Sequence, residues 1–255
     1  MAVDPQTLDL LCDPETHAPL ELAGDGLINR ESGQNYPIRD GIPVFLREVS
    51  GPNRKYQKMY DRLAPGYDFA ERLYRWVARK PDLRPAYLCE LEILAGARVL
   101  EVSVGTGANL RYLRPDIEFF GLDLSWGMLR RCRRIVKRWQ SNAQLFQGEA
   151  ERLPFRDAVF DCVFHVGGIN FFNDRARAIR EMIRVARSRT KILIVDETEK
   201  VVREQYEKNP LTRPHFAHRE DAVSCPTDLV PAEMGEIQAR DFAEGELYCL
   251  TFRKP

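Results

Sequence analysis

Short apolar runs alternate with helical patterns over most of the C-terminal two thirds of the chain. The segments between most of these runs carry apolar residues at the three- and four-residue spacing of an amphipathic helix. Alternation of this kind predicts parallel strands connected by helices, which together form an α/β sheet. The predicted strands are residues 98–103, 119–123, 143–149, 160–166 and 191–198.

The clearest helical pattern begins after Asp174. Ile179, Met182, Ile183 and Ala186 follow at i, i+3, i+4 and i+7 spacing, which predicts one apolar face. Asp174 suits the N-cap position, where a side-chain oxygen accepts hydrogen bonds from the free N–H groups of the first turn. A helix is therefore expected immediately before the last strand of the alternating region.

The C-terminal end of the chain carries two β-like runs in place of a further helix. The runs EIQARDF (236–242) and LYCLTFRK (247–254) are joined by AEGE, which predicts an antiparallel hairpin. Five strands from the alternating region and two from the hairpin predict a doubly wound, mostly parallel, seven-stranded Rossmann-like sheet with an antiparallel edge.

The first part of the chain has a different composition. Residues 1–50 are rich in Pro, Gly, Asp and Asn and contain short apolar runs, which predicts a small β-rich unit with tight turns. A helical pattern follows from about residue 54, is interrupted at Ala64-Pro65-Gly66 and stops at Pro81. We therefore expect two domains, residues 1–50 and 54–255.

Composition and charge narrow the classes of protein to which the chain can belong. Lys plus Arg and Asp plus Glu are both 38, so the overall charge predicts no general attraction to nucleic acid or anionic membranes. No apolar stretch approaches the roughly 20 residues that span a bilayer, and the start MAVDPQTLDL lacks the basic region of a signal peptide. The six cysteines show no paired spacing, which indicates reduced thiols and a cytoplasmic location.

The segment LEVSVGTG (100–107) carries the first candidate chemistry. Gly105 and Gly107 follow a predicted strand and precede a predicted helix, and in an open parallel sheet a ligand binds beyond the carboxyl ends of the strands. The next strand ends in Asp123, about 20 residues further on, where an acid accepts hydrogen bonds from ribose hydroxyls. Leu110 stands where a dinucleotide loop would have its third glycine, which argues against a dehydrogenase.

A third motif, GEAERLPF (148–155), follows the next strand and precedes FDCVFHV. In this order the motifs resemble class I S-adenosylmethionine-dependent methyltransferases, particularly the small-molecule, type 11 branch with the ubiquinone/menaquinone C-methyltransferases. The resemblance covers about residues 56–200, and YDRLAPGYD (60–68) is similar to the lid motif of that branch. It implies S-adenosylmethionine as the cofactor, bound by Tyr60, Tyr67, Glu101, Ser103, Gly105, Gly107, Asp123, Leu124, Met128, Glu149, Ala150 and His165.

The resemblance also implies where each part of the cofactor would lie. The loop glycines would face the methionine part, Asp123 the ribose, and Leu124 and Met128 the adenine ring. Glu149 and the amide of Ala150 would contact the adenine edge. Ser103 departs from the family because a glycine is usual at this position, and the turn before the fifth strand lacks the usual KPGG.

Several residues allow both a functional and a structural interpretation. His165 could be a general base, or a residue whose backbone contacts the cofactor. Tyr60 and Tyr67 could close over the positively charged sulfonium, because aromatic faces attract cations, or could serve helix packing. Asn170, Phe171 and Phe172 could line an apolar substrate pocket or could serve ordinary packing.

The N-terminal unit has a resemblance of its own. DPETHAPLELAGDGLINRESGQNYPIRDGIPVFL is similar to a small zinc-ribbon-like family whose best-known member activates tRNA and protein methyltransferases. Metal-binding members carry four cysteines where this chain has Asp13, Thr16, Asn29 and Ser32. We therefore expect a β-rich domain that has kept its fold without a metal and that forms a lid or docking surface.

Two arginine-rich helices raise the question of nucleic acid. RRCRRIVKR (130–138) and RARAIREMIRVAR (175–187) are expected on opposite faces of the sheet, whereas a stripe that follows phosphates needs its charges on one face. The sequence therefore favours methyl transfer from S-adenosylmethionine to a small, partly apolar molecule. The alternatives are an RNA methyltransferase and a non-catalytic activator or scaffold with this fold.

Overall fold

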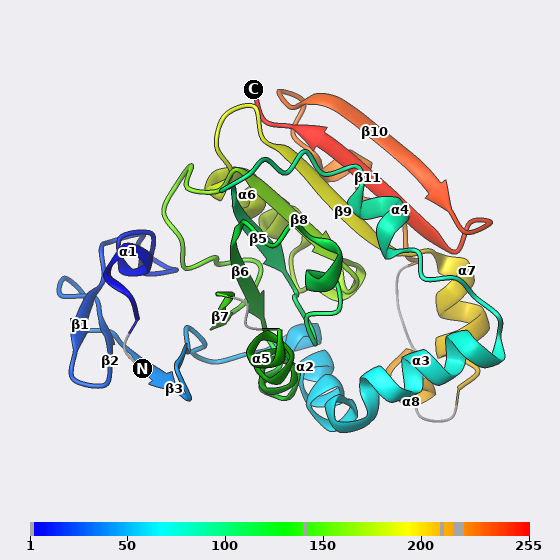
Figure 1. The fold of residues 1–255 in the computed structure, drawn as a ribbon, viewed down its shortest axis with the longest axis horizontal. Coiled ribbons are helices and arrows are strands. Elements are labelled where there is room, and N and C mark those ends of the chain that lie inside the picture. The colour runs from blue at the N-terminus through cyan, green and yellow to red at the C-terminus, as the bar shows by residue number, and fades with distance from the viewer. Residues whose placement is uncertain (1–2, 140–141, 210–211, 217–221) are drawn as a thin grey trace.

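The computed structural model describes residues 3–139, 142–209, 212–216 and 222–255 of the 255-residue chain. The described residues form one large sheet of seven strands and one small sheet of four. Figure 1 shows the small sheet, in blue, beside the large sheet rather than over its centre. No helix in the described part of the chain is both long and apolar enough to cross a membrane.

The large sheet has the topology predicted from the apolar runs. Its strand order is β10-β11-β9-β8-β5-β6-β7, with β10 and β11 antiparallel and the other neighbouring pairs from β9 to β7 parallel. The order reverses between β5 and β8, which makes the carboxyl ends of these two strands the switch point where ligands bind. The strands are β5 (Arg98–Val102), β6 (Glu118–Asp123), β7 (Gln144–Gln147), β8 (Cys162–Val166), β9 (Lys191–Glu197), β10 (Gly235–Phe242) and β11 (Leu247–Arg253).

The helices lie where the patterns predicted them, with one exception. The residues after the glycine loop form only the 3₁₀ turn η2 (Leu110–Tyr112) in place of a full helix, since Pro115 follows closely and cannot continue one. The other helical elements are α2 (Gly51–Leu63), η1 (Ala64–Gly66), α3 (Tyr67–Val77), α4 (Arg84–Leu88), α5 (Trp126–Arg138), η3 (Ile169–Phe171), α6 (Arg175–Val185), α7 (Glu199–Val201), the π-helical turn η4 (Val202–Tyr206), α8 (Arg213–Phe216) and η5 (Thr227–Leu229).

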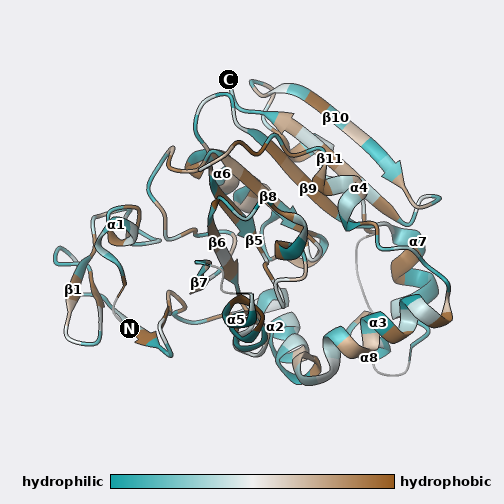
Figure 2. Ribbon diagram, in the orientation of Figure 1, coloured by the Kyte–Doolittle hydropathy of each residue, from teal (hydrophilic) through white to brown (hydrophobic). Residues whose placement is uncertain are grey.

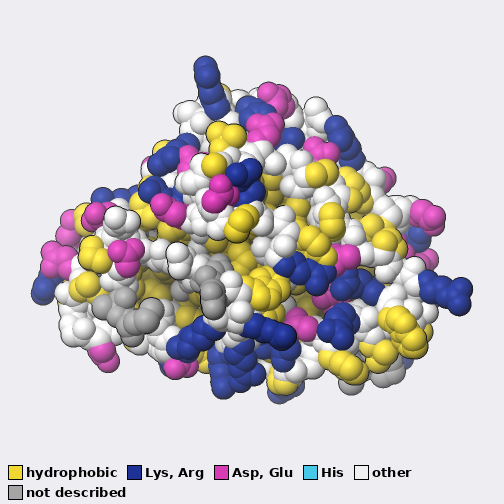
Figure 3. Space-filling view, in the orientation of Figure 1, with side chains coloured by type: hydrophobic (Ala, Val, Ile, Leu, Met, Phe, Trp, Pro, Cys, Tyr) yellow, Lys and Arg dark blue, Asp and Glu magenta, His cyan; other side chains and the backbone are white. Residues whose placement is uncertain are grey.

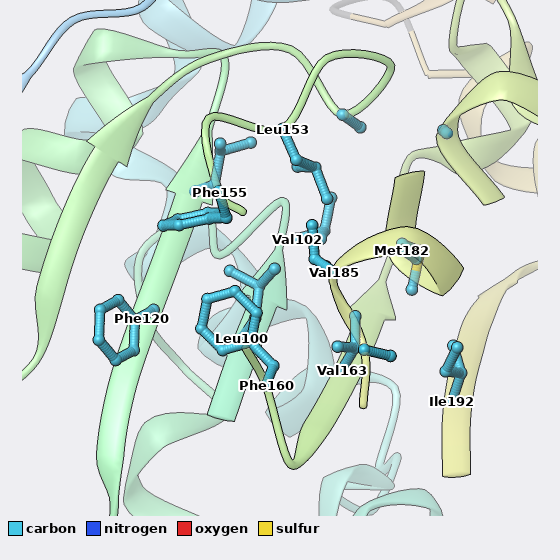
Figure 4. Packing of buried hydrophobic residues seen from close by; sticks show 14 of the residues in the cluster. Leu100, Val102, Phe120, Leu153, Phe155, Phe160, Val163, Met182, Val185 and Ile192 are labelled. Carbon is cyan, nitrogen blue, oxygen red and sulfur yellow. The ribbon is translucent and has the colours of Figure 1, made fainter. Parts of the chain in front are cut away.

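Helices α5 and α6 cover opposite faces of the sheet, as expected. Leu129 and Cys132 of α5 pack with Val99 on one face. Met182 and Val185 of α6 belong to the same buried cluster as Leu100 on the other face, and Figure 4 shows side chains of this cluster. Figure 2 shows the hydrophobic central strands, whereas β10 at the edge is more polar. The predicted cap also forms, because the side chain of Asp174 accepts from the N–H of Arg177.

The N-terminal unit completes one face of the large sheet. Residues 148–161, between β7 and β8, form no helix, and Leu11 and Phe45 of the N-terminal unit pack with Phe155 in the same core cluster. The N–H of Phe45 donates to the carbonyl of Gln147 at 2.7 Å, and Val44 pairs with Gln147 as a parallel bridge. The N-terminal unit therefore extends the sheet beside β7 and protects its edge.

The N-terminal unit itself is built on a small antiparallel sheet, as its turn-rich sequence predicted. Strands β1 to β4 pair in sequence order, and a short helix precedes them. The elements are α1 (Pro5–Leu8), β1 (Glu21–Ala23), β2 (Gly26–Ile28), β3 (Asn35–Arg39) and β4 (Ile42–Pro43).

Hydrogen bonds link the positions where metal-binding relatives carry cysteines. Nδ2 of Asn29 donates to Oδ2 of Asp13 at 2.8 Å and to Oγ1 of Thr16 at 3.1 Å, and the Tyr36 hydroxyl also donates to Asp13. Oδ1 of Asp13 and of Asn29 each accept the backbone N–H groups two and three residues later. Ser32 is exposed. A buried polar network thus joins the two turns.

Candidate functional site

The loop after β5 turns through three positive φ angles. Ser103, Gly105 and Gly107 have φ values of 63°, 56° and 81°. Glycine adopts this left-handed region without strain, whereas the side chain of Ser103 makes the same conformation costly. The predicted departure from the family pattern is therefore a real local strain in this chain.

The two loop glycines serve different purposes. A Cβ at Gly105 would meet no heavy atom within 4 Å, so this glycine borders open space. A Cβ at Gly107 would lie 2.7 Å from the Sγ of Cys132 on α5. Gly107 is thus required for close packing of the loop on helix α5, a role that the sequence pattern did not reveal.

Asp123, at the carboxyl end of β6, holds this loop in place. Its Oδ2 accepts the N–H of Gly105 and its Oδ1 accepts the N–H of Ser125, both at 2.8 Å. Burial raises the pKa of this carboxyl group to about 6, partly offset by those two backbone hydrogen bonds. Each oxygen keeps a second lone pair, so the group can still accept hydrogen bonds from a ligand.

A narrow cleft lies beside this acid. It brings together four of the predicted cofactor residues, Ser103, Leu124, Glu149 and Ala150, and one predicted pocket residue, Phe172. The remaining lining residues are Asn53, Leu122, Gly148 and Glu151.

Asn53 and Glu151 were not identified from the sequence. Nδ2 of Asn53 donates to Oε1 of Glu149 and to Oε1 of Glu151, both at 3.0 Å. Oε2 of Glu151 is buried without a hydrogen-bond partner, and burial raises the pKa of this group. Asn53 lies outside the family motifs and Glu151 is one of two neighbouring acids, so no pattern in the sequence singled them out.

Glu101 and Met128 lie just beneath the site. Oε1 of Glu101 accepts from Nδ2 of Asn109 at 2.6 Å, whereas its Oε2 is buried without a partner. Burial raises the pKa of Glu101 to about 8, so this side chain is protonated at neutral pH. Met128 is 3% exposed, and its N–H donates to the N-cap hydroxyl of Ser125 at the start of α5.

His165 is held between the ends of β5 and η3. Its Nδ1 lies 3.0 Å from the carbonyl oxygen of Val102 and therefore donates to it, and its Nε2 accepts the N–H of Ile169 at 3.0 Å. The ring is fully buried, and burial lowers its pKa to about 4. Because both nitrogens are already bonded, this geometry favours a structural role for the side chain over a general base.

The three residues predicted for a substrate pocket lie in different environments. Nδ2 of Asn170 donates to the carbonyl of Glu197, and its Oδ1 accepts from the Tyr248 hydroxyl. Phe171 packs against Tyr56, with ring centres 4.8 Å apart. Only Phe172, named above, borders the cleft.

The lid tyrosines lie across from a group that the sequence analysis missed. The rings of Tyr60 and Tyr67 meet edge to face with centres 6.2 Å apart. At the carboxyl end of β9, Oε1 of Glu197 accepts from the Tyr206 hydroxyl at 2.6 Å. Burial raises the pKa of Tyr206, and Glu197 and the two lid tyrosines raise it further.

Asp196 joins this group from the interior. Its Oδ2 accepts the N–H of Asn170 at 3.0 Å, and its pKa is raised by burial and by the adjacent Glu197. The two acids end a predicted strand at the edge where ligands bind, which is the signal that could have identified them. Tyr206 follows nine residues later on a π-helical turn, which no spacing rule predicts.

The polar groups of this edge suit the cofactor that the sequence resemblance implies. Asp123 can accept from ribose hydroxyls, and Glu149 and Glu151 can accept from the amino group of adenine. Leu122 and Leu124 supply apolar contacts for a ring. Acids and aromatic rings together also favour the positive sulfonium group.

Comparisons with known proteins agree with this fit. A family model described as a methyltransferase domain matches residues 100–194, and one described as a Trm112p-like protein matches residues 4–41. The demethylmenaquinone methyltransferase of Thermotoga maritima is 30% identical over 158 residues, which cover 58% of this chain and 64% of that protein. The ubiquinone/menaquinone biosynthesis C-methyltransferase UbiE of Geobacter sulfurreducens is 30% identical and covers 60% and 62%.

A solved structure supports the fold. A chain from the complex between the Haloferax volcanii Trm112 methyltransferase activator and a methyltransferase has a TM-score of 0.62 and 16% identity, and the match covers 78% of this chain and 97% of that one. The present chain spans less than two thirds of the length of the two curated relatives. Together these comparisons support a class I S-adenosylmethionine-dependent methyltransferase, with S-adenosylmethionine as the cofactor and a Trm112-like N-terminal domain.

Proposed function

We propose that the protein methylates a small, partly apolar molecule with a hydroxylated aromatic ring of the quinol type. The observation that carries this proposal is the hydrogen-bonded pair of Glu197 and Tyr206 near the two lid tyrosines. The curated relatives with about 30% identity are named for ubiquinone and menaquinone methylation, which supports the same substrate class.

The cofactor residues divide the site in two. In this proposal Asp123 binds the ribose, and Glu149, Ala150 and Glu151 surround the adenine, all near the carboxyl ends of β6 and β7. The acceptor molecule then lies over the ends of β8 and β9, on the other side of the switch point. The lid tyrosines supply the apolar wall of that half.

The chain's own residues orient the acceptor and take up its proton. When bound, S-adenosylmethionine supplies an electrophilic methyl group. Tyr206 and Glu197 hold the acceptor hydroxyl, so that the ring carbon beside it is in line for attack. The methyl group that the cofactor would supply would be transferred to this carbon, and Glu197 would take up the proton that the acceptor loses.

Radiolabelled cofactor tests the substrate class. The protein is incubated with labelled S-adenosylmethionine and either a nuclease-treated small-molecule extract or total RNA. We expect label in the organic-extractable fraction, unaffected by salt, and a large loss in Glu197→Gln with cofactor binding retained. Label found only in RNA and fading between about 50 and 200 mM salt would identify an RNA methyltransferase instead.

The Trm112-like domain favours a supporting role for the N-terminal part of the chain. In the Haloferax volcanii complex named above, activator and methyltransferase are partners in a complex. Here we propose that the N-terminal domain performs a supporting role within the chain, because β4 leads into the hydrogen bond between Phe45 and Gln147 beside β7. Cofactor binding without turnover on any extract, together with co-purification of a second methyltransferase, would favour an activator or scaffold acting on another chain.

A further inference from the structure

Helix α3 presents its apolar face to solvent. Phe69, Leu73, Trp76 and Val77 are 69%, 45%, 78% and 67% exposed, and none of the eleven residues of α3 is buried. Their i, i+4, i+7, i+8 spacing places these four side chains on one face of the helix. Figure 3 shows hydrophobic side chains at the lower right, where Figure 1 places α3.

The opposite, polar face of α3 attaches the helix to the protein. Nη1 of Arg75 lies 2.6 Å from Oδ2 of Asp82, and Glu71 lies 2.5 Å from Nη2 of Arg84. Asp68 pairs with Arg131 of α5 at 2.6 Å. Surface helices of globular proteins normally bury their apolar face and expose their polar one. Helix α3 does the reverse, which indicates that its apolar face meets something other than water.

Unpaired basic residues surround this face. Arg130, Arg134, Lys137 and Arg138 of α5 are exposed and follow the same i, i+4, i+7, i+8 spacing. Within the described part of the chain, none of these four forms an ion pair. Further exposed basic residues lie on α2, on α3 and just after α3, namely Arg54, Lys55, Lys58, Arg62, Arg72 and Arg79.

Helices α2, α3 and α5 carry a net positive charge, whereas the whole chain is neutral. Residues 51–80 hold eight Lys and Arg against three Asp and Glu, and residues 126–138 hold six against none. The chain overall has 38 of each. The expectation that the overall charge gives no general attraction to nucleic acid or anionic membranes therefore does not apply to this side of the molecule.

The three helices form one connected surface. Oδ1 of Asp61 on α2 accepts from the hydroxyl of Ser125 and from the N–H of Gly127 at the start of α5. Arg131 of α5 also donates to the carbonyl of Pro65, in the turn between α2 and α3. In Figure 3 the Lys and Arg side chains gather along the lower edge, next to the hydrophobic side chains of the lower right.

We propose that this side of the molecule docks on an anionic lipid bilayer, with the apolar face of α3 at the headgroup boundary and the basic residues of α2 and α5 on the phosphates. A bilayer interface offers both an apolar layer and negative charge, and amphipathic helices with Trp, Phe and Leu beside Lys and Arg bind it. Phosphates of RNA would account for the basic residues but leave Leu73 and Val77 exposed.

The docked orientation determines the route by which the substrate reaches the site, an inference that rests on the proposed function. Tyr60 and Tyr67 flank the turn between α2 and α3, so the lid over the acceptor half belongs to the docking surface itself. An apolar quinol dissolved in the bilayer would enter the acceptor half directly from the membrane.

Vesicle flotation with the full-length protein and no substrate tests the docking separately from catalysis. We expect flotation with phosphatidylcholine vesicles that contain phosphatidylglycerol, little with phosphatidylcholine alone, and a loss at high salt. Leu73→Ser/Val77→Ser and Arg134→Glu/Lys137→Glu should each reduce binding by roughly tenfold or more. Unchanged S-adenosylmethionine affinity, measured by calorimetry, verifies that these variants are folded.

Two matched controls lie away from the surface. Leu94 is 76% exposed between α4 and β5, and Arg180 is exposed on α6, across the sheet from α5. Leu94→Ser and Arg180→Glu should float like the wild type. Equal losses in the controls, absence of flotation with anionic vesicles, self-association that Leu73→Ser/Val77→Ser abolishes, or RNA binding with no lipid binding would each overturn the proposal.

Discussion

At the scale of single residues, Asp123 has two tasks that can be separated experimentally. It holds the glycine loop through Gly105 and is expected to accept the ribose hydroxyls of the cofactor. We predict that Asp123→Ala lowers the affinity for S-adenosylmethionine by about tenfold to a hundredfold, because a hydrogen bond to a charged group contributes roughly 1.5–3 kcal/mol. Calorimetry measures this, with exposed Asp40→Ala as the control. Equal affinity in Asp123→Ala would contradict the ribose assignment.

The raised pKa of Asp123 predicts a pH dependence. The pKa of this carboxyl group is near 3.8 in the unfolded chain and about 6 in the fold. This group therefore lowers the free energy of unfolding as pH rises from about 4 to about 6, and its effect is constant above that. Ionisation makes it a better acceptor for ribose, so cofactor affinity should rise through pH 6. Calorimetry across this range should show that step in the wild type and not in Asp123→Asn.

Ser103 adopts a backbone conformation that is unfavourable for a residue with a side chain. Its φ of 63° lies in the left-handed region, which costs a non-glycine residue roughly 1–2 kcal/mol. We predict that Ser103→Gly raises the free energy of unfolding by about 0.5–1 kcal/mol, after the entropy that glycine loses on folding. Urea denaturation measures this, and Ser32→Gly in an exposed turn is the control. A destabilised Ser103→Gly would mean that the hydroxyl makes a contact worth more than the strain.

At the scale of elements, the two turns of the N-terminal domain depend on Asn29. Its amide group satisfies Asp13 and Thr16, and its Oδ1 accepts two backbone N–H groups. We predict that Asn29→Ala lowers the free energy of unfolding by about 1–3 kcal/mol, because it leaves buried polar groups without partners. Urea denaturation measures this, with Ser32→Ala as the control.

The same network predicts how the domain responds to chelators. Structural zinc normally requires four thiolate or imidazole ligands, and the corresponding positions here hold Asp13, Thr16, Asn29 and Ser32. The melting temperature should therefore be unchanged by a zinc chelator. Elemental analysis that finds about one zinc per chain after dialysis would show that the ligand positions were assigned to the wrong residues.

The elements could be predicted from the sequence to different extents. Six strands of the large sheet were identifiable as short apolar runs bounded by turns, and the more polar β10 by the turn that joins it to β11. Asp174 marks a helix start by local chemistry alone. The turn η2 was overestimated as a helix, because glycine spacing does not reveal how soon a proline ends the element. Gly107 looked like a ligand residue, since its neighbour Cys132 is adjacent only in the fold.

The site was predictable only where its residues belong to contiguous motifs. Asp123, Glu149 and Ala150 follow strands and could be identified by their order along the chain. Asn53 contacts Glu151 across 98 residues, and this pairing exists only once α2 has packed against the large sheet. Such contacts leave no periodicity in the sequence.

At the scale of the whole molecule, the two domains share one core. Leu11 is fully buried in the same cluster as Phe155 and Phe120 of the methyltransferase domain, and its backbone pairs with Phe155 as an antiparallel bridge. A shared core predicts that neither domain unfolds without the other. We therefore expect one calorimetric transition for the full chain, with equal van't Hoff and calorimetric enthalpies.

Leu11→Ala tests that coupling directly. Truncation of a buried leucine removes about 2–5 kcal/mol of stability, through lost burial and the cavity left behind. If the core is shared, this loss lowers the temperature of the single unfolding transition of the whole chain. S-adenosylmethionine binding is then weakened at that same temperature. Leu22→Ala, at a side chain that is 41% exposed on β1, should leave the transition unchanged. A separate small transition that moves alone in Leu11→Ala, while the main transition stays in place, would show that the N-terminal domain folds independently and supports the sheet only by contact.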